Sequence, residues 1–187
     1  VYFYKNKNLY LYIFGKKYNL KKLALINNIQ KENLECAIAC AVAMNIRIKK
    51  IINCLHKLKS APGRFEMINF RKKNSKIIID YAHTPDALEN ILKTFSFNNL
   101  KPSLVFGCGG NRDKEKRKKM GIVAKKYANK IYITDDNPRY ENPKTIRESI
   151  KKYCPKAVDI SNRRKAIHEA ILKLDINDIL IIAGKGH

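Results

Sequence analysis

The chain has 187 residues, of which 45% are hydrophobic, and its formal net charge at pH 7 is +23. This composition excludes a disordered polymer, and no apolar run approaches the roughly 18 residues that a membrane-spanning helix needs. The Lys residues are spread along the whole chain without an Arg-rich tail or a nucleic-acid-binding signature, so we expect neither a nucleic-acid nor a membrane partner. The charge would steer anionic ligands toward the surface.

The chain opens on an alternating, aromatic stretch. Residues 1–4 and 9–14 predict a hairpin that belongs to a larger sheet, because a lone hairpin is at best marginally stable in water. At the other end, a buried-strand pattern over residues 179–183 runs into the glycine-rich residues 184–187, where the sequence stops. We therefore expect a piece of a longer protein that is truncated at both ends.

Two helices are expected next. From about residue 32 to residue 58 the apolar residues recur at helical spacing, with an interruption near Asn45. The pattern changes after Pro62-Gly63, a pair that marks a turn. This change predicts a domain boundary between residues 1–61 and residues 62–187.

The second part alternates between strand and helix patterns. Strands are expected at residues 65–70, 76–80, 103–106, 130–134, 157–160 and 179–182, and helices at residues 85–95, 116–127, 143–153 and 163–172. Strict alternation predicts an α/β fold, a Rossmann-like, mostly parallel sheet flanked by helices. Such sheets bind ligands at the carboxyl ends of their strands.

Polar clusters stand directly after four of the predicted strands. They are residues 80–85, 107–113, 135–139 and 184–187. Because the carboxyl ends of parallel strands lie at one edge of a sheet, we expect these clusters to build one shared site.

The third cluster contains Asp136, Asn137, Pro138 and Arg139. It joins two acceptors, a rigid proline and a fixed cation, which suits a small ligand that carries both an ammonium and a carboxylate group. Taken singly, Arg139 can equally be a solvated surface residue.

The other clusters have structural alternatives when each is taken alone. Asp80 with Thr84-Pro85 fits a turn that caps the start of a helix. His83 alone fits a packed or surface histidine. The glycines of residues 107–110 match neither the P-loop nor the GxGxxG pattern.

Five motifs follow one another along the chain: Gly63-Arg64-Phe65-Glu66, residues 80–88, residues 105–114, residues 134–139 and Ala183-Gly184-Lys185-Gly186-His187. Together they resemble in order and spacing the C-terminal part of MurE-type ligases, the UDP-N-acetylmuramoyl-L-alanyl-D-glutamate:2,6-diaminopimelate ligases of peptidoglycan synthesis. The resemblance is continuous from about Gly63 to His187. It implies a Mur ligase C-terminal domain in residues 62–187, preceded in residues 1–61 by the end of an α/β ATP-binding central domain.

The resemblance implies a reaction that uses ATP and Mg²⁺. Such ligases convert a carboxylate to an acyl phosphate, which an amino-acid amine attacks to form an amide. Arg64 would contact the ATP phosphates, Asp80 would hold the ribose hydroxyls, and His83 would lie near the phosphates. Asn33 or Asn28 would approach the adenine, although N-capping of a helix is an equal alternative for them.

The resemblance also implies the amino-acid site. Arg112 and the segment from Asp136 to Arg139 would hold meso-diaminopimelate, and the Gly184 carbonyl would accept from its distal ammonium group. Lysine lacks the distal carboxylate, so it would leave an arginine desolvated and unpaired. The sequence therefore favours diaminopimelate over lysine.

Several parts of the family pattern do not occur in the 187 residues. We find no Gly-Lys-Thr/Ser loop, no carbamylated lysine, no magnesium ligands and no UDP-binding domain. We therefore expect no catalytic residue and no metal ligand in this chain, and no ligase activity from it alone. The full-length protein is expected to be a monomer that acts on a UDP-N-acetylmuramoyl dipeptide and diaminopimelate.

The cysteines indicate the compartment. The chain has 5 Cys residues and no CxxC pair, which predicts small buried residues rather than a disulfide or zinc framework. The first residues lack the shape of a signal peptide. We expect a cytoplasmic location.

Two kinds of alternative stay open. The first is another Mur-type amide ligase: a lysine-adding enzyme, a folylpolyglutamate synthase or a cyanophycin synthetase, the last two of which share Asp-Tyr-Ala-His-like motifs. The second is a non-catalytic, basic Rossmann-like binding module. The segment from Asp136 to Arg139 argues against the folylpolyglutamate and cyanophycin enzymes, whereas salt-dependent binding of generic DNA without binding of ATP or diaminopimelate would favour the second.

Overall fold

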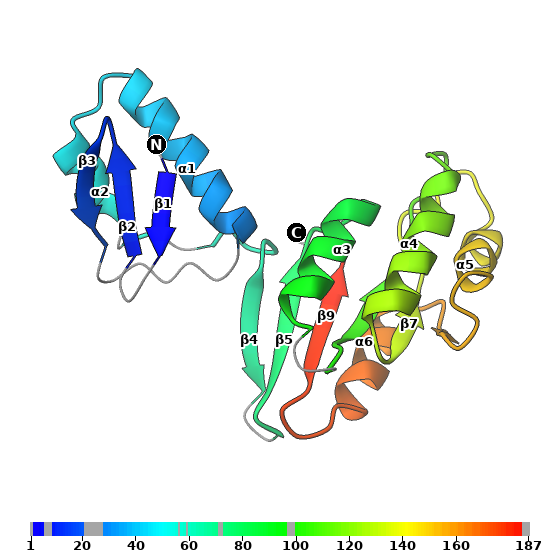
Figure 1. Cartoon of the computed structure of the whole chain (residues 1–187). Helices are drawn as coiled ribbons and strands as arrows, with labels where there is room; N and C mark the ends of the chain where they lie inside the picture. Colours follow the sequence, from blue (N-terminus) through cyan, green and yellow to red (C-terminus); the bar gives the residue numbers. More distant parts are fainter. Residues whose placement is uncertain are drawn as a thin grey trace. The chain divides into compact units, whose positions relative to one another are not determined.

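The computed structural model divides into two compact units, Val1–Lys59 and Ser60–His187 (Figure 1). The residues that the structure describes are 2–5, 9–20, 28–55, 57–58, 60–70, 73–96 and 100–184. Every helix among them is too short or too polar to cross a bilayer.

The first unit has a three-stranded sheet and two helices. The strands β1 (Tyr2–Lys5), β2 (Leu9–Ile13) and β3 (Lys16–Asn19) pair antiparallel in the order β1-β2-β3, and the helices are α1 (Asn28–Ala43) and α2 (Ile48–Leu55). The hairpin and the two helices expected from the sequence are confirmed. A small core joins the sheet and the helices: Leu11, Ile13, Leu20, Ile38, Ile51 and Leu55.

The third strand was not predicted. It follows a tight turn in which both Phe14 (φ 48°) and Gly15 (φ 74°) have positive φ, the conformation of a two-residue hairpin loop. The strand itself begins with Lys16 and Lys17 and lacks an apolar alternation, so the pattern gave no strand signal.

Two expectations for the first unit are wrong. Because α1 begins at Asn28, Asn33 lies inside the helix, exposed, and does not cap it; the side chain of Asn28 lies outside the described residues. Cys36 and Cys40 are exposed rather than buried, since each is two positions from the buried Ile38 and therefore off the apolar face of α1. Cys54 is exposed as well.

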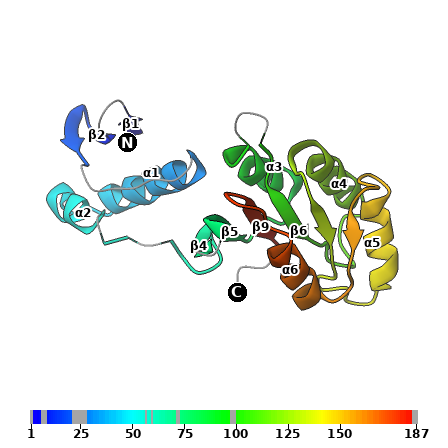
Figure 2. The same cartoon turned by 90° about the horizontal axis from the view of Figure 1, so that it is seen from below.

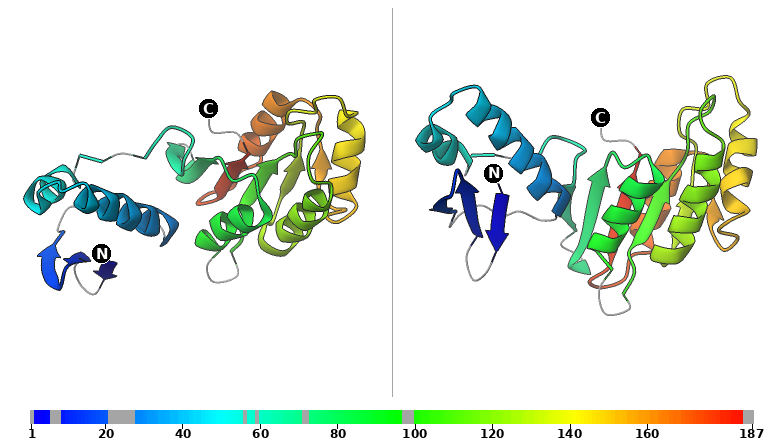
Figure 3. Two further views of the ribbon diagram at one scale, coloured as in Figure 1. Left: turned by 90° about the horizontal axis from the view of Figure 1, so that it is seen from above. Right: turned by 45° about the horizontal axis from the view of Figure 1, so that its top comes forward.

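The second unit is built on a six-stranded sheet with the order β4-β5-β9-β6-β7-β8 (Figure 2). Strand β4 runs antiparallel to β5, and all the other neighbours are parallel, so the mostly parallel sheet is confirmed. The strands are β4 (Glu66–Phe70), β5 (Ser75–Asp80), β6 (Ser103–Phe106), β7 (Ile131–Ile133), β8 (Val158–Asp159) and β9 (Ile179–Ala183). Strand β9 lies between β5 and β6, although about 70 residues separate it from β6 in sequence (Figure 3).

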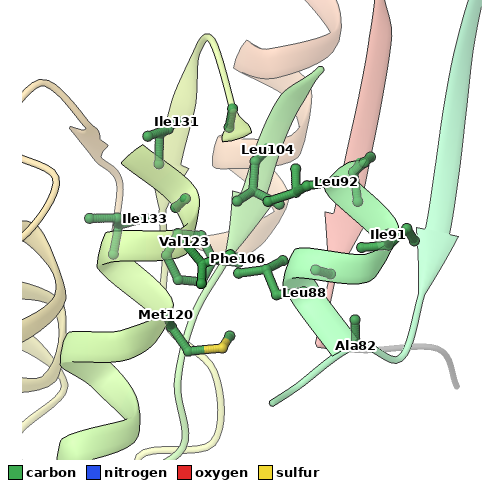
Figure 4. Close-up of a cluster of buried hydrophobic side chains, with 14 of the residues drawn as sticks. Ala82, Leu88, Ile91, Leu92, Leu104, Phe106, Met120, Val123, Ile131 and Ile133 are labelled. Carbon is green, nitrogen blue, oxygen red and sulfur yellow. The ribbon is translucent and has the colours of Figure 1, made fainter. Parts of the chain in front are cut away.

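The four helices of this unit divide between the two faces of the sheet. They are α3 (Pro85–Thr94), α4 (Glu115–Tyr127), α5 (Pro143–Lys151) and α6 (Arg163–Leu172). Residues of α3, α4 and α5 join one core cluster, whereas Ala166 and Ala170 of α6 join the other. Figure 4 shows the first cluster between β6 and the helices α3 and α4, with Leu88, Leu92, Leu104, Phe106, Met120 and Val123 labelled.

The central strands supply both cores. In β5, Ile78 faces the first cluster and Ile77 the second; in β6, Leu104 and Phe106 face the first and Val105 the second. Successive side chains of a strand point to opposite faces, so a sheet covered on both sides needs apolar residues at every position. This requirement explains the unbroken apolar runs of the sequence.

Helix α3 begins with a capping interaction that positions the loop before it. Thr84 Oγ1 accepts a hydrogen bond of 3.3 Å from the Ala87 N–H, and Pro85 occupies the first helical position. We expect Thr84→Ala to lower the free energy of unfolding by about 1 kcal/mol, because the Ala87 N–H loses its partner. Urea unfolding followed by circular dichroism measures this loss.

Thr94→Ala is the matched control for that substitution. The control is the same substitution at the other end of α3. There the Thr94 Oγ1 donates to the Asn90 carbonyl one turn earlier and caps no backbone N–H among the described residues. The control should change the free energy of unfolding by less than about 0.5 kcal/mol. Equal losses for the two variants would contradict a capping role for Thr84.

Candidate functional site

The carboxyl ends of β5, β6, β7 and β9 meet at one edge of the sheet. The Gly184 N–H, after β9, donates to the Asp80 carbonyl at the end of β5 over 3.1 Å. A Cβ placed on Gly184 would lie 3.5 Å from Asp136 Oδ2 and 4.0 Å from the carbonyl oxygens of Ala82 and Gly107. The structure therefore brings together residues from all four of the polar clusters that the sequence placed after strands.

The loop after β6 and the loop after β7 are interlocked through their backbones. A Cβ on Gly107 would lie 2.3 Å from the Thr134 carbonyl oxygen, and one on Gly110 would lie 1.9 Å from that of Pro138. The Gly110 N–H donates to the Asn137 carbonyl over 2.8 Å. Glycine is required at both positions because the backbone of the neighbouring loop occupies the space of a side chain.

Arg139 folds back over the loop after β6, residues 107–110, which we call the glycine loop. Its Nη1 donates to the Gly110 carbonyl over 2.8 Å, and its backbone N–H donates to Asn137 Oδ1 over 3.2 Å. Its φ is +50°, an uncommon value for a residue with a side chain. The side-chain contact that the structure describes uses one of the five guanidinium donors, so others can meet a ligand.

Arg112 and Arg139 stand in neighbouring loops. Asn111, directly before Arg112, accepts through Oδ1 a hydrogen bond of 2.9 Å from the N–H of Tyr140, directly after Arg139. Both arginines are exposed. Two exposed guanidinium groups on adjoining loops match a ligand with two carboxylates, since each carboxylate can accept two parallel hydrogen bonds.

An ion pair between a buried arginine and a partly exposed glutamate links these loops to α4. Arg117, on the inward face of α4, is 4% exposed and donates to Glu141 Oε1 over 2.8 Å. The hydrogen bond from Arg117 and a second from the Asn111 N–H lower the pKa of Glu141 to about 2. Glu141 is therefore an anion throughout the neutral range.

Arg147 of α5 joins the start of the loop after β7 to the neighbouring strand. Its Nη1 donates to Asp135 Oδ1, and its Nε donates to Asp159 Oδ1 over 2.6 Å. Burial opposes the charge of Arg147, but the hydrogen bonds to the two carboxylates outweigh it and raise its pKa. The pair of bonds fixes the direction in which the loop leaves β7.

Asp136 and Gly184 lie beside Arg163 of α6. Arg163 Nη2 donates to the Ala183 carbonyl over 2.9 Å, while Nη1 is buried without a partner among the described residues. Burial lowers the pKa of Arg163, and the charge of Asp136 partly opposes this. Gly184 has φ +93°, which a residue with a side chain rarely adopts.

Cys108 is a packing residue of the glycine loop. Its thiol is 5% exposed, and burial raises its pKa to about 11. A thiol that stays protonated at neutral pH is a poor nucleophile. With Thr134, Asp135, Asp136, Pro138, Pro143, Ile146 and Arg147, Cys108 lines a small surface pocket.

Three residues predicted for nucleotide contacts lie around the end of β5. Asp80 accepts hydrogen bonds of 2.8 Å from the N–H groups of Phe65 and Ala82, one on each carboxylate oxygen. The Arg64 guanidinium lies 4.0 Å from the centre of the Tyr81 ring, and this ring meets His83 edge to face at 4.7 Å. Arg64 and His83 are both exposed.

The other predicted site residues lie in the first unit or outside the described residues. Asn33, predicted to approach adenine, belongs to the first unit and is exposed on α1. Lys185, Gly186 and His187 lie outside the described residues. Within the described parts of the chain, no three His, Cys, Asp or Glu side chains gather in an arrangement that could hold a metal ion.

Four residues that support the site were not predicted from the sequence: Arg117, Arg147 and Arg163 on helices, and Glu141 in the loop after β7. For Arg117 a signal exists. It precedes the buried Met120 by three positions and the buried Ala124 by seven, so it stands on the apolar face of α4. A charged residue there requires a buried partner.

Comparison with protein families matches residues 63–186 to the Mur ligase, glutamate ligase domain. A UDP-N-acetylmuramoyl-L-alanyl-D-glutamate–2,6-diaminopimelate ligase of Rickettsia conorii is 43% identical over 188 residues, which cover 98% of this chain and 38% of the relative. A solved structure of a ligase with that name is 34% identical with a TM-score of 0.62, and the match covers 96% of this chain and 37% of that one.

A Mycobacterium tuberculosis folylpolyglutamate synthase complexed with ADP has a TM-score of 0.73 at 18% identity, over 95% of this chain and 42% of that one, which shows the shared fold alone. The chain spans less than two fifths of the length of the curated relatives it matches. The family match covers all of the second unit's sheet and helices, and it confirms the resemblance that the five motifs indicated. The chain belongs to the Mur ligase family, and residues 63–186 are its glutamate ligase domain.

Proposed function

We propose that this chain supplies the amino-acid site, and part of the ATP site, of a ligase that adds meso-diaminopimelate to UDP-N-acetylmuramoyl-L-alanyl-D-glutamate in peptidoglycan synthesis. The observation that carries the proposal is the placement of Arg112 and Arg139 on adjoining loops, with Asp136 and Gly184 at the same edge of the sheet. Relatives at 43% identity have names that state this activity.

The amino-acid site fits the chemistry of diaminopimelate. Besides the amine that reacts, this ligand presents two carboxylates and one further ammonium group. Arg112 and Arg139 would pair with the carboxylates. The Asp136 carboxylate and the Gly184 carbonyl would receive the ammonium, and the missing side chain of Gly184 leaves space for it, since a Cβ there would lie 3.5 Å from Asp136 Oδ2.

The proposed nucleotide contacts lie around the end of β5. When bound, ATP supplies the phosphoryl group that converts the dipeptide carboxylate to an acyl phosphate. Arg64 and His83 are exposed cations or hydrogen-bond donors suited to its phosphates, and the Asp80 oxygens keep lone pairs that can accept from ribose hydroxyls. Asn33 would approach adenine, and the Mg²⁺ ligands would come from residues outside this chain.

A chimaera tests the proposal. In it, the matched segment of the Rickettsia conorii relative, 38% of its length, is replaced by this 187-residue chain. We expect ATP-dependent ligation of diaminopimelate to the UDP-linked dipeptide, with kcat/KM at least about 100-fold above that for lysine. A preference for lysine would establish the lysine-adding alternative instead, and a chimaera that folds but ligates neither amino acid would overturn the proposal.

The 187-residue chain by itself is expected to form no amide. Its sequence holds no Gly-Lys-Thr/Ser loop, and the backbone and Lys of such a loop are what cradle the ATP phosphates. Mass spectrometry of the UDP-linked product, with the chimaera as the positive control, measures this. Product formed by the chain alone above the level of a protein-free reaction would contradict the expectation. The proposed setting is a cytoplasmic enzyme that is monomeric at full length.

A further inference from the structure

The ion pair between Arg117 and Glu141 joins three separate segments. Arg117 comes from the first turn of α4, and its Nη2 reaches Glu141 Oε1 at 2.8 Å and the Gly109 carbonyl at 3.5 Å. The same oxygen of Glu141 accepts the N–H of Asn111 at 2.5 Å. One carboxylate oxygen therefore ties α4 and the glycine loop to the loop that carries Arg139.

The position of the pair relative to the two exposed arginines is fixed by sequence. Asn111, held by Glu141, directly precedes Arg112, and Glu141 stands two residues after Arg139. A separate hydrogen bond links the Tyr140 N–H to Asn111 Oδ1 at 2.9 Å. These two hydrogen bonds connect the loop that carries Arg112 to the loop that carries Arg139.

Arg117 is not placed to bind the amino acid itself. Arg117 is 4% exposed, and its Nε is buried without a partner among the described residues. Its guanidinium is directed at Glu141 and the Gly109 carbonyl, behind the loops. Separation of the pair would leave the buried Arg117 charge without its partner, and this cost favours the one arrangement of the loops that keeps Glu141 in place.

We propose that Arg117 and Glu141 are positioning residues that set the spacing between Arg112 and Arg139, and through it the selection of diaminopimelate over lysine. The inference rests on the proposed function. Two guanidinium groups can serve two carboxylates of one ligand only at the separation that the ligand dictates, and a misplacement of about 1 Å in such a site can cost about 100-fold. The exposed arginines make the contacts, and the ion pair between Arg117 and Glu141 sets their distance.

The kinetic test uses Arg117→Lys and Glu141→Gln in the chimaera. Lys keeps the charge but not the two-pronged guanidinium, and Gln keeps the shape but not the charge. Each should raise KM for diaminopimelate about 10- to 100-fold and lower the preference over lysine by a similar factor. KM for ATP should stay within about twofold, because the pair does not touch the Arg64 and His83 side of the edge.

The matched controls are Lys144→Gln and Glu148→Gln. These residues form an ion pair on the surface of α5, with side chains 75% and 59% exposed. Glu148→Gln repeats the chemical change of Glu141→Gln, and Lys144→Gln removes the partner charge, both on α5 and outside the two loops. The kinetic constants of both variants should equal those of the unsubstituted chimaera. An equal rise of KM for ATP and for diaminopimelate in the Arg117 or Glu141 variants would overturn the proposal, as would an unchanged KM for diaminopimelate.

A second measurement needs no ligand and separates this proposal from the proposed function. Hydrogen exchange in the 187-residue chain reports the amides of Asn111, Gly110 and Tyr140, which bond across the two loops. Glu141→Gln should speed their exchange together, while the amide of Ile181 in β9 keeps its rate. If the unsubstituted chimaera joins no diaminopimelate, the proposed function fails; unaltered exchange at all three amides in a folded variant overturns the pair's role in holding the loops.

Discussion

Arg139→Ala in the chimaera is expected to raise KM for diaminopimelate by about 100-fold and to remove most of the preference over lysine. The substitution deletes an exposed guanidinium that is held over the glycine loop by the Gly110 carbonyl, next to Arg112 in the adjoining loop. Diaminopimelate then loses the partner of one carboxylate, whereas lysine, which has no second carboxylate, loses little. Steady-state kinetics with each amino acid measures both effects.

Two comparisons sharpen that experiment. Arg139→Lys keeps a positive charge without the planar fork, so its KM for diaminopimelate should fall between those of the Ala variant and the unsubstituted chimaera. Arg164→Ala removes another exposed arginine, in the first turn of α6, and should leave the kinetics unchanged. The assignment of Arg139 to the amino-acid site would be abandoned if the Ala variant discriminated as well as its parent.

Gly110→Ala should destabilise the second unit by about 2–3 kcal/mol. The added methyl group would meet backbone atoms of Pro138, the carbonyl oxygen at 1.9 Å and the carbonyl carbon at 2.7 Å. Backbone atoms of a neighbouring loop cannot turn aside, so the loops must separate and the hydrogen bond from Gly110 to the Asn137 carbonyl is lost. Urea unfolding of the variant and of the unsubstituted chain gives the difference in free energy.

Gly109→Ala places the same methyl group one position earlier and serves as the comparison for Gly110→Ala. Its methyl group would lie 2.8 Å from Arg139 Nη1, the far end of a flexible side chain. We expect less than about 1 kcal/mol of destabilisation, together with a raised KM for diaminopimelate, because Arg139 must leave its position to make room. Similar losses of stability in the two alanine variants would show that the backbone approach at Gly110 is not tight.

The alternation of strands and helices was readable from the sequence because each element carries its own period of apolar residues. The order of the strands in the sheet could not be predicted from the sequence. Residues 77–79, 104–106 and 180–182 are equally apolar, since both faces of the central sheet are covered, and nothing local distinguishes their neighbours. Placement of β9 between β5 and β6 depends on how the helices pack, which a linear pattern does not contain.

The residues of the candidate site also divide into those that a local sequence pattern indicates and those that depend on packing. The residues proposed to face a ligand follow strands directly, so the rule that ligands bind at strand ends leads to Asp136, Arg139 and Gly184. The supporting arginines come from helices and bond to residues farther away in the chain, with 24 positions between Arg117 and Glu141. Arg147 meets both of its carboxylates across 12 positions. Such pairs follow from three-dimensional packing and leave little trace in local spacing.

The place of β9 in the sheet has a consequence for synthesis on the ribosome. Its side chains enter both cores, Ile181 and Ala183 on one face and Leu180 and Ile182 on the other, and its backbone pairs with β5 and β6 at once. A nascent chain that has emerged only as far as α6 therefore has the two halves of its sheet unjoined, with two unpaired apolar strand edges in water. This domain completes its fold only after residue 183 has emerged, and until then it is a natural client for chaperones.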